Sequence, residues 1–391
     1  MTPDLFLIRP REPSPLVFAD LAAQQDRLRP ELEQGMHRVL HHGNYILGPE
    51  VKTLERSLAQ FSGMQHCVTC ASGTDALQLA MMALGVGPGD AVFVPAFTFM
   101  ASAETVSLLG AEPRFVDIDP RTYTMDPAAL EMEILRCRTE GGLHPRCVMP
   151  VDLFGLPADY PALRGICARH DLILLADSAQ GFGSTYHGVM ACTLADVTAT
   201  SFFPAKPLGC YGDGGAVFTH DAALAEKILS LRLHGKGTDK YDNVRIGVNS
   251  RLDTLQAAIL QVKLAAFPQE LVARRQVAAL YDARLSGHVT IPFVPTGLES
   301  AWAQYGVQIH ARDAVENRLR ALRIPTAVYY PKPLPFQTAY ADQGHQPGRF
   351  PVAEALSRRI LHLPMHPDLT VQEIDQIANA LLTAVAESQN A

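Results

Sequence analysis

Charge and long apolar runs are both scarce in this chain of 391 residues. Charged residues make up 19% of it, and Asp and Glu outnumber Lys and Arg by 40 to 33, for a net charge of -7. Such a surface repels phosphate backbones, so nucleic-acid binding is disfavoured. No segment approaches the length that a bilayer requires, and the first residues lack the apolar core of a signal peptide. We expect a cytoplasmic protein that binds neither nucleic acid nor membranes.

Cysteine is sparse and odd in number, and no metal site is predicted. Cys67 and Cys70 form one CxxC motif with no second motif after it, which gives a zinc or redox pair little support. Their apolar surroundings predict a buried strand, where cysteine behaves as a small hydrophobe. His362 and His366 are separated by Pro364, so we expect a loop with packing or hydrogen-bonding roles there.

Hydrophobic residues are abundant, at 48% of the chain. Together with the length of the chain, they are sufficient for the cores of one large domain and one smaller domain. Helical spacing predicts two helices over about residues 24–41 and 51–61. Short apolar or β-branched runs then alternate with helical segments, which predicts an α/β sheet covered on both faces. Strands are expected near residues 67–70, 91–95, 114–118, 147–151, 172–177, 197–203 and 215–219, and helices between them over about 73–85, 99–109, 127–137, 159–170 and 221–233.

The pattern changes in the C-terminal third. A long helix follows Asp253, the helical pattern loosens past about residue 265, and prolines become frequent. We therefore divide the chain into a flexible N-terminal arm at 1–16, a large α/β domain at 17–262 and a small C-terminal α+β domain at 263–391. The final helix should present Val371, Ile374, Ile377 and Leu381 on one face.

Candidate chemistry collects just after the strands, where ligands of such sheets bind. Gly73 and Thr74 begin a helix, whose free N–H groups and partial positive charge favour a phosphate, although a plain helix cap explains the same residues. Asp117 and Asp152 follow two further strands. Asp177 ends a buried strand, and a pyridinium nitrogen or a local cap or ion pair would account for it equally well.

Lys206 stands alone between apolar residues and a glycine-rich turn, in SFFPAKPLGCYGDGGA. Pro207 biases it away from helix, so its amine is held on a loop. Exposed loop lysines are common, but Phe202 and Phe203 favour burial here. A desolvated lysine has a lowered pKa and can act as a Schiff-base nucleophile.

The order of these motifs, SGTDAL, PAFTFMASAE, ADSAQ, SFFPAKPLGCYGDGGA and GVNSRLDTLQAAIL, resembles the DegT/DnrJ/StrS family of sugar aminotransferases. The resemblance covers the chain from about residue 17 to its end. It implies an aspartate aminotransferase-like fold (fold type I), with a large, mostly parallel seven-stranded sheet, and pyridoxal 5′-phosphate (PLP) as cofactor. It also implies a ping-pong transfer of an amine, that of glutamate, to a nucleotide-linked ketosugar.

Each matching residue acquires an expected role from this resemblance. Lys206 would carry the cofactor and then move protons, Asp177 would face the pyridine nitrogen, and Gln180 would lie near the ring hydroxyl. Phe99 would stack on the ring. The phosphate would be bound by Gly73, Thr74, Ser201 and, from the neighbouring subunit of a homodimer with shared sites, Asn249.

Further segments of the chain point to a class of sugar substrate. GNYILGPEV, LGVGPGD and DIDPRTY are most similar to a branch that aminates UDP-2-acetamido-2-deoxy-3-keto-glucuronate for surface polysaccharides such as the lipopolysaccharide O-antigen. Arg251 would pair with the sugar carboxylate, or else with a structural acid at the subunit boundary. Tyr329 and Tyr330 are expected on the substrate side. Tyr329 stands where a histidine is frequent and Phe336 where a polar residue is usual, which leaves the exact sugar open.

Other functions are compatible with the same fold. The chain could aminate another dTDP- or UDP-linked ketosugar, or be a regulatory protein without turnover. A regulatory protein would be expected to lose Lys206 or Asp177, and related dehydratases carry histidine in place of the lysine. The basic residues Arg232, His234, Lys236 and Lys240 could meet a nucleotide diphosphate or form a solvated face.

Overall fold

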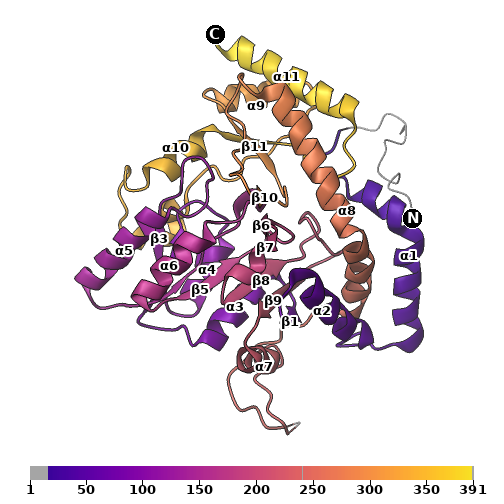
Figure 1. Cartoon of the computed structure of the whole chain (residues 1–391), viewed down its shortest axis with the longest axis vertical. Helices are drawn as coiled ribbons and strands as arrows, with labels where there is room; N and C mark the ends of the chain where they lie inside the picture. Colours follow the sequence, from indigo (N-terminus) through magenta and orange to yellow (C-terminus); the bar gives the residue numbers. More distant parts are fainter. Residues whose placement is uncertain (1–15, 240, 390–391) are drawn as a thin grey trace.

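Seven strands form one sheet in the computed structural model, which describes residues 16–239 and 241–389 (Figure 1). Their order is β1-β9-β8-β5-β4-β2-β3, and β9 is antiparallel to both of its neighbours. All seven predicted strands and the mostly parallel sheet are confirmed. Most of the predicted N-terminal arm lies outside the described residues. The strands are β1 (His66–Cys70), β2 (Asp90–Pro95), β3 (Glu112–Val116), β4 (His144–Val148), β5 (Ile173–Asp177), β8 (Val197–Ser201) and β9 (Gly215–Thr219).

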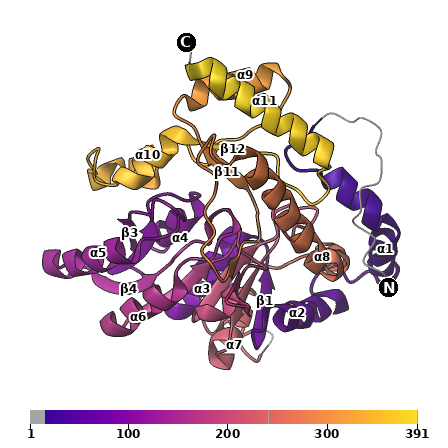
Figure 2. The same ribbon diagram turned by 45° about the horizontal axis from the view of Figure 1, so that its top comes forward.

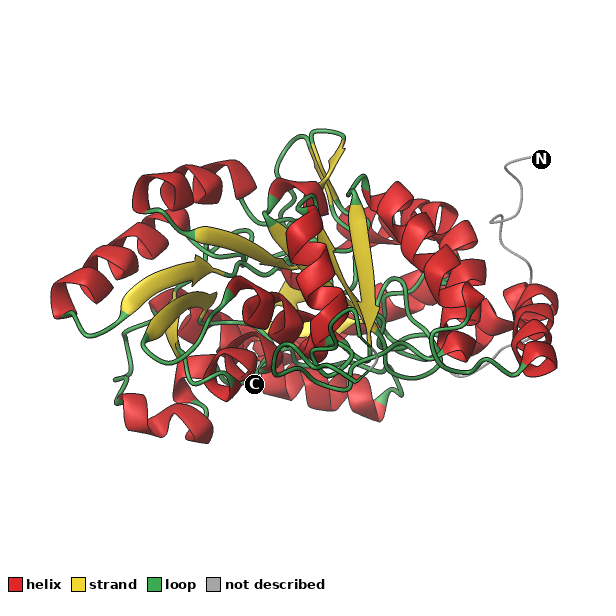
Figure 3. Cartoon of the chain, turned by 90° about the horizontal axis from the view of Figure 1, so that it is seen from below, coloured by secondary structure: helices red, strands yellow, loops and turns green. Residues whose placement is uncertain are grey.

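Helices cover both faces of this sheet (Figure 3). One face packs against α3 (Gly73–Leu84), α4 (Ala101–Leu108) and α7 (Ala222–Leu231). The other packs against α2 (Pro49–Ser62), α5 (Pro127–Glu140) and α6 (Tyr160–His170). Successive strand residues therefore enter opposite cores, which explains why the strands are continuous apolar runs: Val92 and Phe93 are both fully buried, on different faces.

The long helix α8 (Thr254–Leu285) joins two cores and extends far beyond the predicted loosening at residue 265. Its first half packs with α1 (Leu21–His42) and α2, and its second half lies against α11 (Val371–Gln389; Figure 1). The buried face changes along its length, so no single apolar stripe marks the helix in the sequence. The proposed domain boundary at 262/263 falls inside α8, and the division remains a prediction.

A second core surrounds a two-stranded sheet of β11 (Tyr305–Gln308) and β12 (Ile360–Leu363). Figure 2 shows this part of the chain, with α9 and α11 side by side. His362 lies on β12, so the loop expected at this residue is wrong, whereas His366 follows the strand outside regular structure; both are buried. The remaining elements are α9 (Arg312–Ala321), α10 (Pro351–Arg359), α11 (Val371–Gln389), β6 (Thr185–Tyr186), β7 (Val189–Met190) and β10 (Leu298–Glu299).

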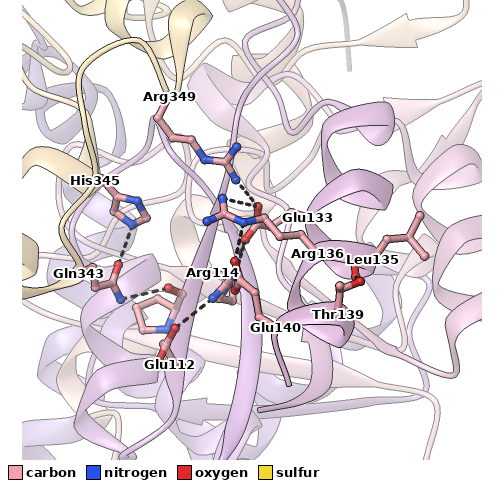
Figure 4. A network of polar contacts seen from close by, with 11 residues as sticks. Glu112, Arg114, Glu133, Leu135, Arg136, Thr139, Glu140, Gln343, His345 and Arg349 are labelled. Atoms are coloured by element: carbon pink, nitrogen blue, oxygen red, sulfur yellow. Dashed lines mark hydrogen bonds and ion pairs between the residues drawn. The ribbon is translucent and has the colours of Figure 1, made fainter. Parts of the chain in front are cut away.

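Ion pairs attach the edge strand β3 to its surroundings (Figure 4). Arg114 on β3 lies 2.7 Å from both Glu133 and Glu140 of α5. Arg349, just before α10, donates to Glu133 at 2.6 Å. Asp117 accepts the first N–H groups of α10 at 3.0 Å. This carboxylate therefore caps a helix, and the chemistry expected after β3 is not found at Asp117.

The cysteines behave as small apolar residues. All seven are free and buried. Cys67 and Cys70 lie on β1, where burial raises the pKa of both thiols. Within the described ranges, no helix has the length and apolar character needed to cross a membrane.

Arg232 at the end of α7 is buried rather than solvated. Its guanidinium donates to Glu55 Oε1 and to the carbonyl oxygen of Thr69, both at 2.6 Å. Glu55 also accepts from the backbone N–H of Thr69, at 2.9 Å. The pair joins α7, β1 and α2, so a nucleotide-binding role does not fit Arg232.

Replacing Arg232 with methionine (R232M) should lower the free energy of unfolding by about 3 kcal/mol, because the largely enclosed carboxylate of Glu55 would lose its cation. Urea denaturation measures this change. The control is R164M, which breaks the exposed pair between Arg164 and Asp196 and should cost less than about 1 kcal/mol. Equal losses in both variants would contradict a structural role specific to Arg232.

Candidate active site

Lys206 and Asp177 come from neighbouring strands of the sheet. Asp177 ends β5, Lys206 lies in the turn that follows β8, and β5 and β8 are paired up to Asp177 and Ala199. Burial lowers the pKa of the Lys206 amine, and the nearby charge of Asp177 partly offsets this effect. Burial likewise raises the pKa of Asp177, while Ser102, Ala179 and the Lys206 charge oppose it. The two side chains therefore act on each other in a largely desolvated setting.

Two uncharged donors hold the Asp177 carboxylate. Its Oδ2 atom accepts from Ser102 Oγ at 2.8 Å, and Oδ1 accepts from the Ala179 backbone N–H at 3.2 Å. Only 5% of Asp177 is exposed. The sequence did not single out Ser102, which lies in the first turn of α4, because nothing in the local sequence distinguishes it from an ordinary helical serine.

Gly73 and Ser201 meet at the start of α3. A Cβ atom on Gly73 would lie 2.5 Å from Ser201 Cβ, so only glycine lets the helix begin this close to the end of β8. Ser72 caps the helix by accepting from the Asp75 N–H at 3.0 Å. The N–H groups of Gly73 and Thr74 precede that bond and have no acceptor within the helix. These three predicted phosphate binders therefore form one cradle suited to an anion.

Phe99, Gln180 and Tyr330 form a second group. The Phe99 ring is 55% exposed and lies 6.2 Å from the Tyr330 ring. Gln180 is buried, donates through Nε2 to the Tyr330 hydroxyl at 3.4 Å, and accepts the Phe154 N–H through Oε1 at 2.6 Å. Burial raises the pKa of Tyr330. The Gln180 side chain is thus fixed at both ends, while Phe99 keeps a free surface.

Asn249 and Arg251 lie beside the end of β1, since Ser250 Oγ between them accepts the Ala71 N–H at 3.1 Å. Asn249 is exposed and Arg251 partly so. The Arg251 guanidinium makes no ion pair or hydrogen bond with residues 16–239 or 241–389. Its structural alternative, pairing with an acid, is therefore not realised within the described part of this chain.

A buried lysine supports the loop after Lys206, and the sequence did not reveal it. Lys263 of α8 donates to the Gly209 carbonyl at 2.7 Å and lies 4.1 Å from the centre of the Tyr211 ring. Burial lowers the pKa of Lys263 to about 8. The glycine-rich turn is thus held to the long helix rather than left free.

Asp152 is a buried residue that follows β4 and lies next to the backbone of Asp177. Its backbone N–H donates to the Asp177 carbonyl at 3.0 Å, and its Oδ1 atom accepts from the Tyr160 hydroxyl at 2.8 Å and from the Ala158 N–H at 3.0 Å. Burial raises the pKa of Asp152 to about 6. The side chain therefore stabilises the turn next to the site.

Comparison with known proteins now identifies the family. The model of the DegT/DnrJ/EryC1/StrS aminotransferase family matches residues 26–382. The chain belongs to this family of aminotransferases. The predicted family and enzyme class are confirmed, and Lys206 and Asp177 belong to an aminotransferase.

Two curated relatives act on UDP-linked sugars. UDP-2-acetamido-2-deoxy-3-oxo-D-glucuronate aminotransferase of Pseudomonas aeruginosa is 48% identical and aligns with 93% of this chain and 99% of its own length. UDP-N-acetyl-3-dehydro-alpha-D-glucosamine 3-aminotransferase of Acidithiobacillus ferrooxidans is 41% identical, over 93% of this chain and 96% of its own. The aminotransferase thus resembles enzymes named for two related ketosugars.

Solved structures confirm the predicted fold class. A DegT/DnrJ/EryC1/StrS aminotransferase from Brucella abortus has a TM-score of 0.93 and 48% identity, over 95% of this chain and 99% of that one. NtdA from Bacillus subtilis, solved with bound pyridoxamine phosphate (PMP), has a TM-score of 0.89 and 28% identity, over 98% and 88%.

Replacing Asp177 with asparagine (D177N) should stabilise the cofactor-free aminotransferase at pH 7. Burial raises the folded-state pKa of Asp177 above its unfolded value, so the folded wild type loses stability as the pH rises through that interval. The stability gain of D177N should disappear below the ordinary pKa of aspartate. Chemical denaturation across pH measures it, with exposed Asp342 changed to asparagine as control. A D177N protein that is less stable than wild type at pH 7 would contradict this account.

Proposed function

We propose that this aminotransferase moves the amino group of L-glutamate to UDP-2-acetamido-2-deoxy-3-keto-glucuronate, for surface polysaccharides such as the lipopolysaccharide O-antigen. The observation that carries the proposal is the largely desolvated pair of Asp177, at the end of β5, and Lys206, in the turn after the adjacent strand β8, in a member of an aminotransferase family. The two UDP-sugar relatives support a nucleotide-linked 3-ketosugar as acceptor.

PLP is the cofactor, as in the relatives solved in PLP and PMP forms, and the residues present fit it. The cradle at Gly73 and Ser201 suits its phosphate, and a Cβ atom at Gly73 would close it. Asp177 is a buried carboxylate held by uncharged donors, which suits a protonated pyridine nitrogen. Phe99 offers an exposed ring for stacking. When bound, PLP supplies an electron-accepting ring that stores the amino group between the two halves of the reaction.

Lys206 and Asp177 have complementary tasks in this proposal. A lowered pKa gives the Lys206 amine a larger neutral fraction near pH 7, so it can act as a nucleophile and can take and return a proton. Ser102 and Ala179 favour the charged form of Asp177, which can then hold a proton on the facing nitrogen. Gln180, fixed by Phe154 and Tyr330, can orient a hydroxyl group.

Arg251 favours an acidic sugar over a neutral one. Its guanidinium is free of internal partners among the described residues, and a planar guanidinium binds a carboxylate through two parallel bonds. The Pseudomonas aeruginosa relative is named for a glucuronate and the Acidithiobacillus ferrooxidans relative for a glucosamine. We infer that the carboxylate decides the choice between these two sugars.

Incubating the pyridoxamine form with a panel of nucleotide ketosugars tests the substrate, because the correct acceptor restores the absorbance of the aldehyde form. The panel contains the UDP-linked keto-uronate, its neutral 3-keto-glucosamine counterpart and a dTDP-linked ketosugar. We expect the keto-uronate to react fastest. Changing Arg251 to alanine (R251A) should lower kcat/KM for the keto-uronate roughly 10- to 100-fold more than for the neutral sugar. The exposed Arg358 provides the control R358A, and equal losses on both sugars would reject the role of Arg251.

We also propose a homodimer in which Asn249 reaches the phosphate of the neighbouring subunit. Apolar side chains near Asn249 are exposed in the single chain, and burial in a second copy would remove them from water. The backbone bridge between Ile46 and Asp253 places residues 45–46 beside the chain that follows Asn249. The exposed side chains are Tyr45, Ile46, Tyr241, Val244 and Ile246. Free cysteines and nucleotide-sugar chemistry support a cytoplasmic location.

Mixing two inactive variants tests the shared site. K206A lacks the cofactor lysine and N249A lacks the proposed partner residue. In a mixed dimer, one site receives both lesions and the other neither, so random exchange should restore about one quarter of wild-type activity. Activity after unfolding and refolding the mixture measures this, with each variant refolded alone as control. No restoration, despite mixed dimers in native mass spectra, would show that Asn249 serves its own chain.

A further inference from the structure

His362 lies at the junction of two segments that hold Gln180. The chain of contacts runs from Gln180 to Phe154, from the Phe154 ring to the His362 ring, from His362 to Tyr329, and from the adjoining Tyr330 back to Gln180. We call these five residues the His362 circuit. Two of its members, Gln180 and Tyr330, belong to the candidate site.

The side chain and the backbone of His362 both hold the segment that leads to Tyr330. The His362 N–H donates to the Ala327 carbonyl at 2.8 Å, and the Ala327 N–H donates to the His362 carbonyl at 3.2 Å. His362 Nδ1 then accepts the Tyr329 N–H at 3.4 Å, and the two rings lie 5.2 Å apart. Three hydrogen bonds with His362 thus hold Ala327 and Tyr329, which both precede Tyr330.

The His362 ring is neutral and tightly enclosed. It is fully buried, and burial lowers its pKa to about 3. Because Nδ1 accepts from Tyr329, we assign the ring proton to Nε2. A Cβ atom on Gly306 of the paired strand β11 would lie 2.7 Å from Nε2, so a glycine is needed there to admit the ring. The space around the His362 side chain therefore fits an imidazole ring closely and leaves the ring little freedom to rotate.

The other half of the circuit depends on Phe154. Its backbone has φ 59°, in the left-handed region that a bulky residue rarely adopts, and this conformation accompanies a 2.6 Å bond from its N–H to Gln180 Oε1. The Phe154 ring packs edge-on against His362, with centroids 4.5 Å apart. Packing against the imidazole therefore helps to hold the turn that fixes Gln180.

We propose that His362 is a positioning residue, which through its bond to Tyr329 sets Tyr330 and Gln180 for the ketosugar and the cofactor. The inference rests on the proposed function, because it assigns Tyr330 to the sugar and Gln180 to PLP. His362 itself touches neither hydrogen-bonding end of Gln180. Its loss should weaken binding of both ligands more than it slows the reaction after binding.

Two variants distinguish the packing of the His362 ring from the hydrogen bond that its Nδ1 atom accepts. H362F keeps an aromatic ring against Phe154 but removes the acceptor for Tyr329, whereas H362N places an amide oxygen near the position of Nδ1. We expect H362F to raise the KM of the ketosugar and the dissociation constant of PLP roughly three- to tenfold, with kcat changed less than about twofold. H362N should restore both constants to within about twofold of wild type.

A matched control comes from His345, which lies in another aromatic cluster. Its ring packs against Phe115 and Phe350, and within residues 16–239 and 241–389 its one hydrogen-bonding contact is with Gln343 (Figure 4). H345F should leave both constants unchanged. Thermal unfolding of every variant separates lost stability from altered binding. Should H362F fail to fold, G306A crowds Nε2 without removing the acceptor and should raise both constants in the same direction.

Unchanged constants in a folded H362F, or in G306A where H362F does not fold, would overturn the proposal. So would an H362N variant as impaired as H362F, because the bond to Tyr329 would then not be the cause. PLP affinity is read from the absorbance of the bound cofactor and needs no sugar. A wild-type enzyme that binds PLP but turns over no ketosugar would therefore refute the proposed function separately. The PLP dissociation constants of the variants would still decide the role of His362.

Discussion

The site depends on one electrostatic constraint: an amine and a carboxylate share a setting from which water is largely excluded. Burial alone would make both groups neutral, and each charge partly reverses that effect on the other. Two uncharged donors, Ser102 and Ala179, favour the carboxylate form of Asp177 without neutralising it. Lys206 is left with a lowered pKa, and Asp177 with a charge that a cationic ring nitrogen can match. The surrounding structure maintains both the lowered pKa of Lys206 and the charge of Asp177.

The sheet supplies the largely water-free setting of Lys206 and Asp177, because helices cover both of its faces. Buried parallel strands bring their carboxyl ends to one edge, where Asp177, Ser201 and the start of α3 meet. The residues that hold these groups come from distant parts of the chain. Lys263 of α8 holds the turn after Lys206, and His362 of β12 holds the segment before Tyr330. Hydrogen bonds from α8 and from β12 thus support two different parts of the site.

Much of the site could be predicted because features of the local sequence mark its residues. Gly73 marks a tight strand-to-helix junction, Asp177 ends an apolar run, and Pro207 keeps Lys206 on a loop. The supporting residues carried no such signal. Ser102 reads as an ordinary helical serine and Lys263 as an ordinary helical lysine. The sequence predicts a loop at His362 because Pro364 lies between it and His366, yet pairing with Gly306 and Ala327 makes His362 part of a strand.

The sequence by itself determined the fold class, the seven strands, the family and the residues at the strand ends, since period, apolar runs and turn residues act over short distances. The tertiary structure alone decided the length of α8, the commitment of Arg232 to Glu55 and of Asp117 to α10, and the contacts of His362. Each of these depends on partners far away in the chain. Whether a buried polar group is paired, and with which residue, is settled only when the packed elements meet.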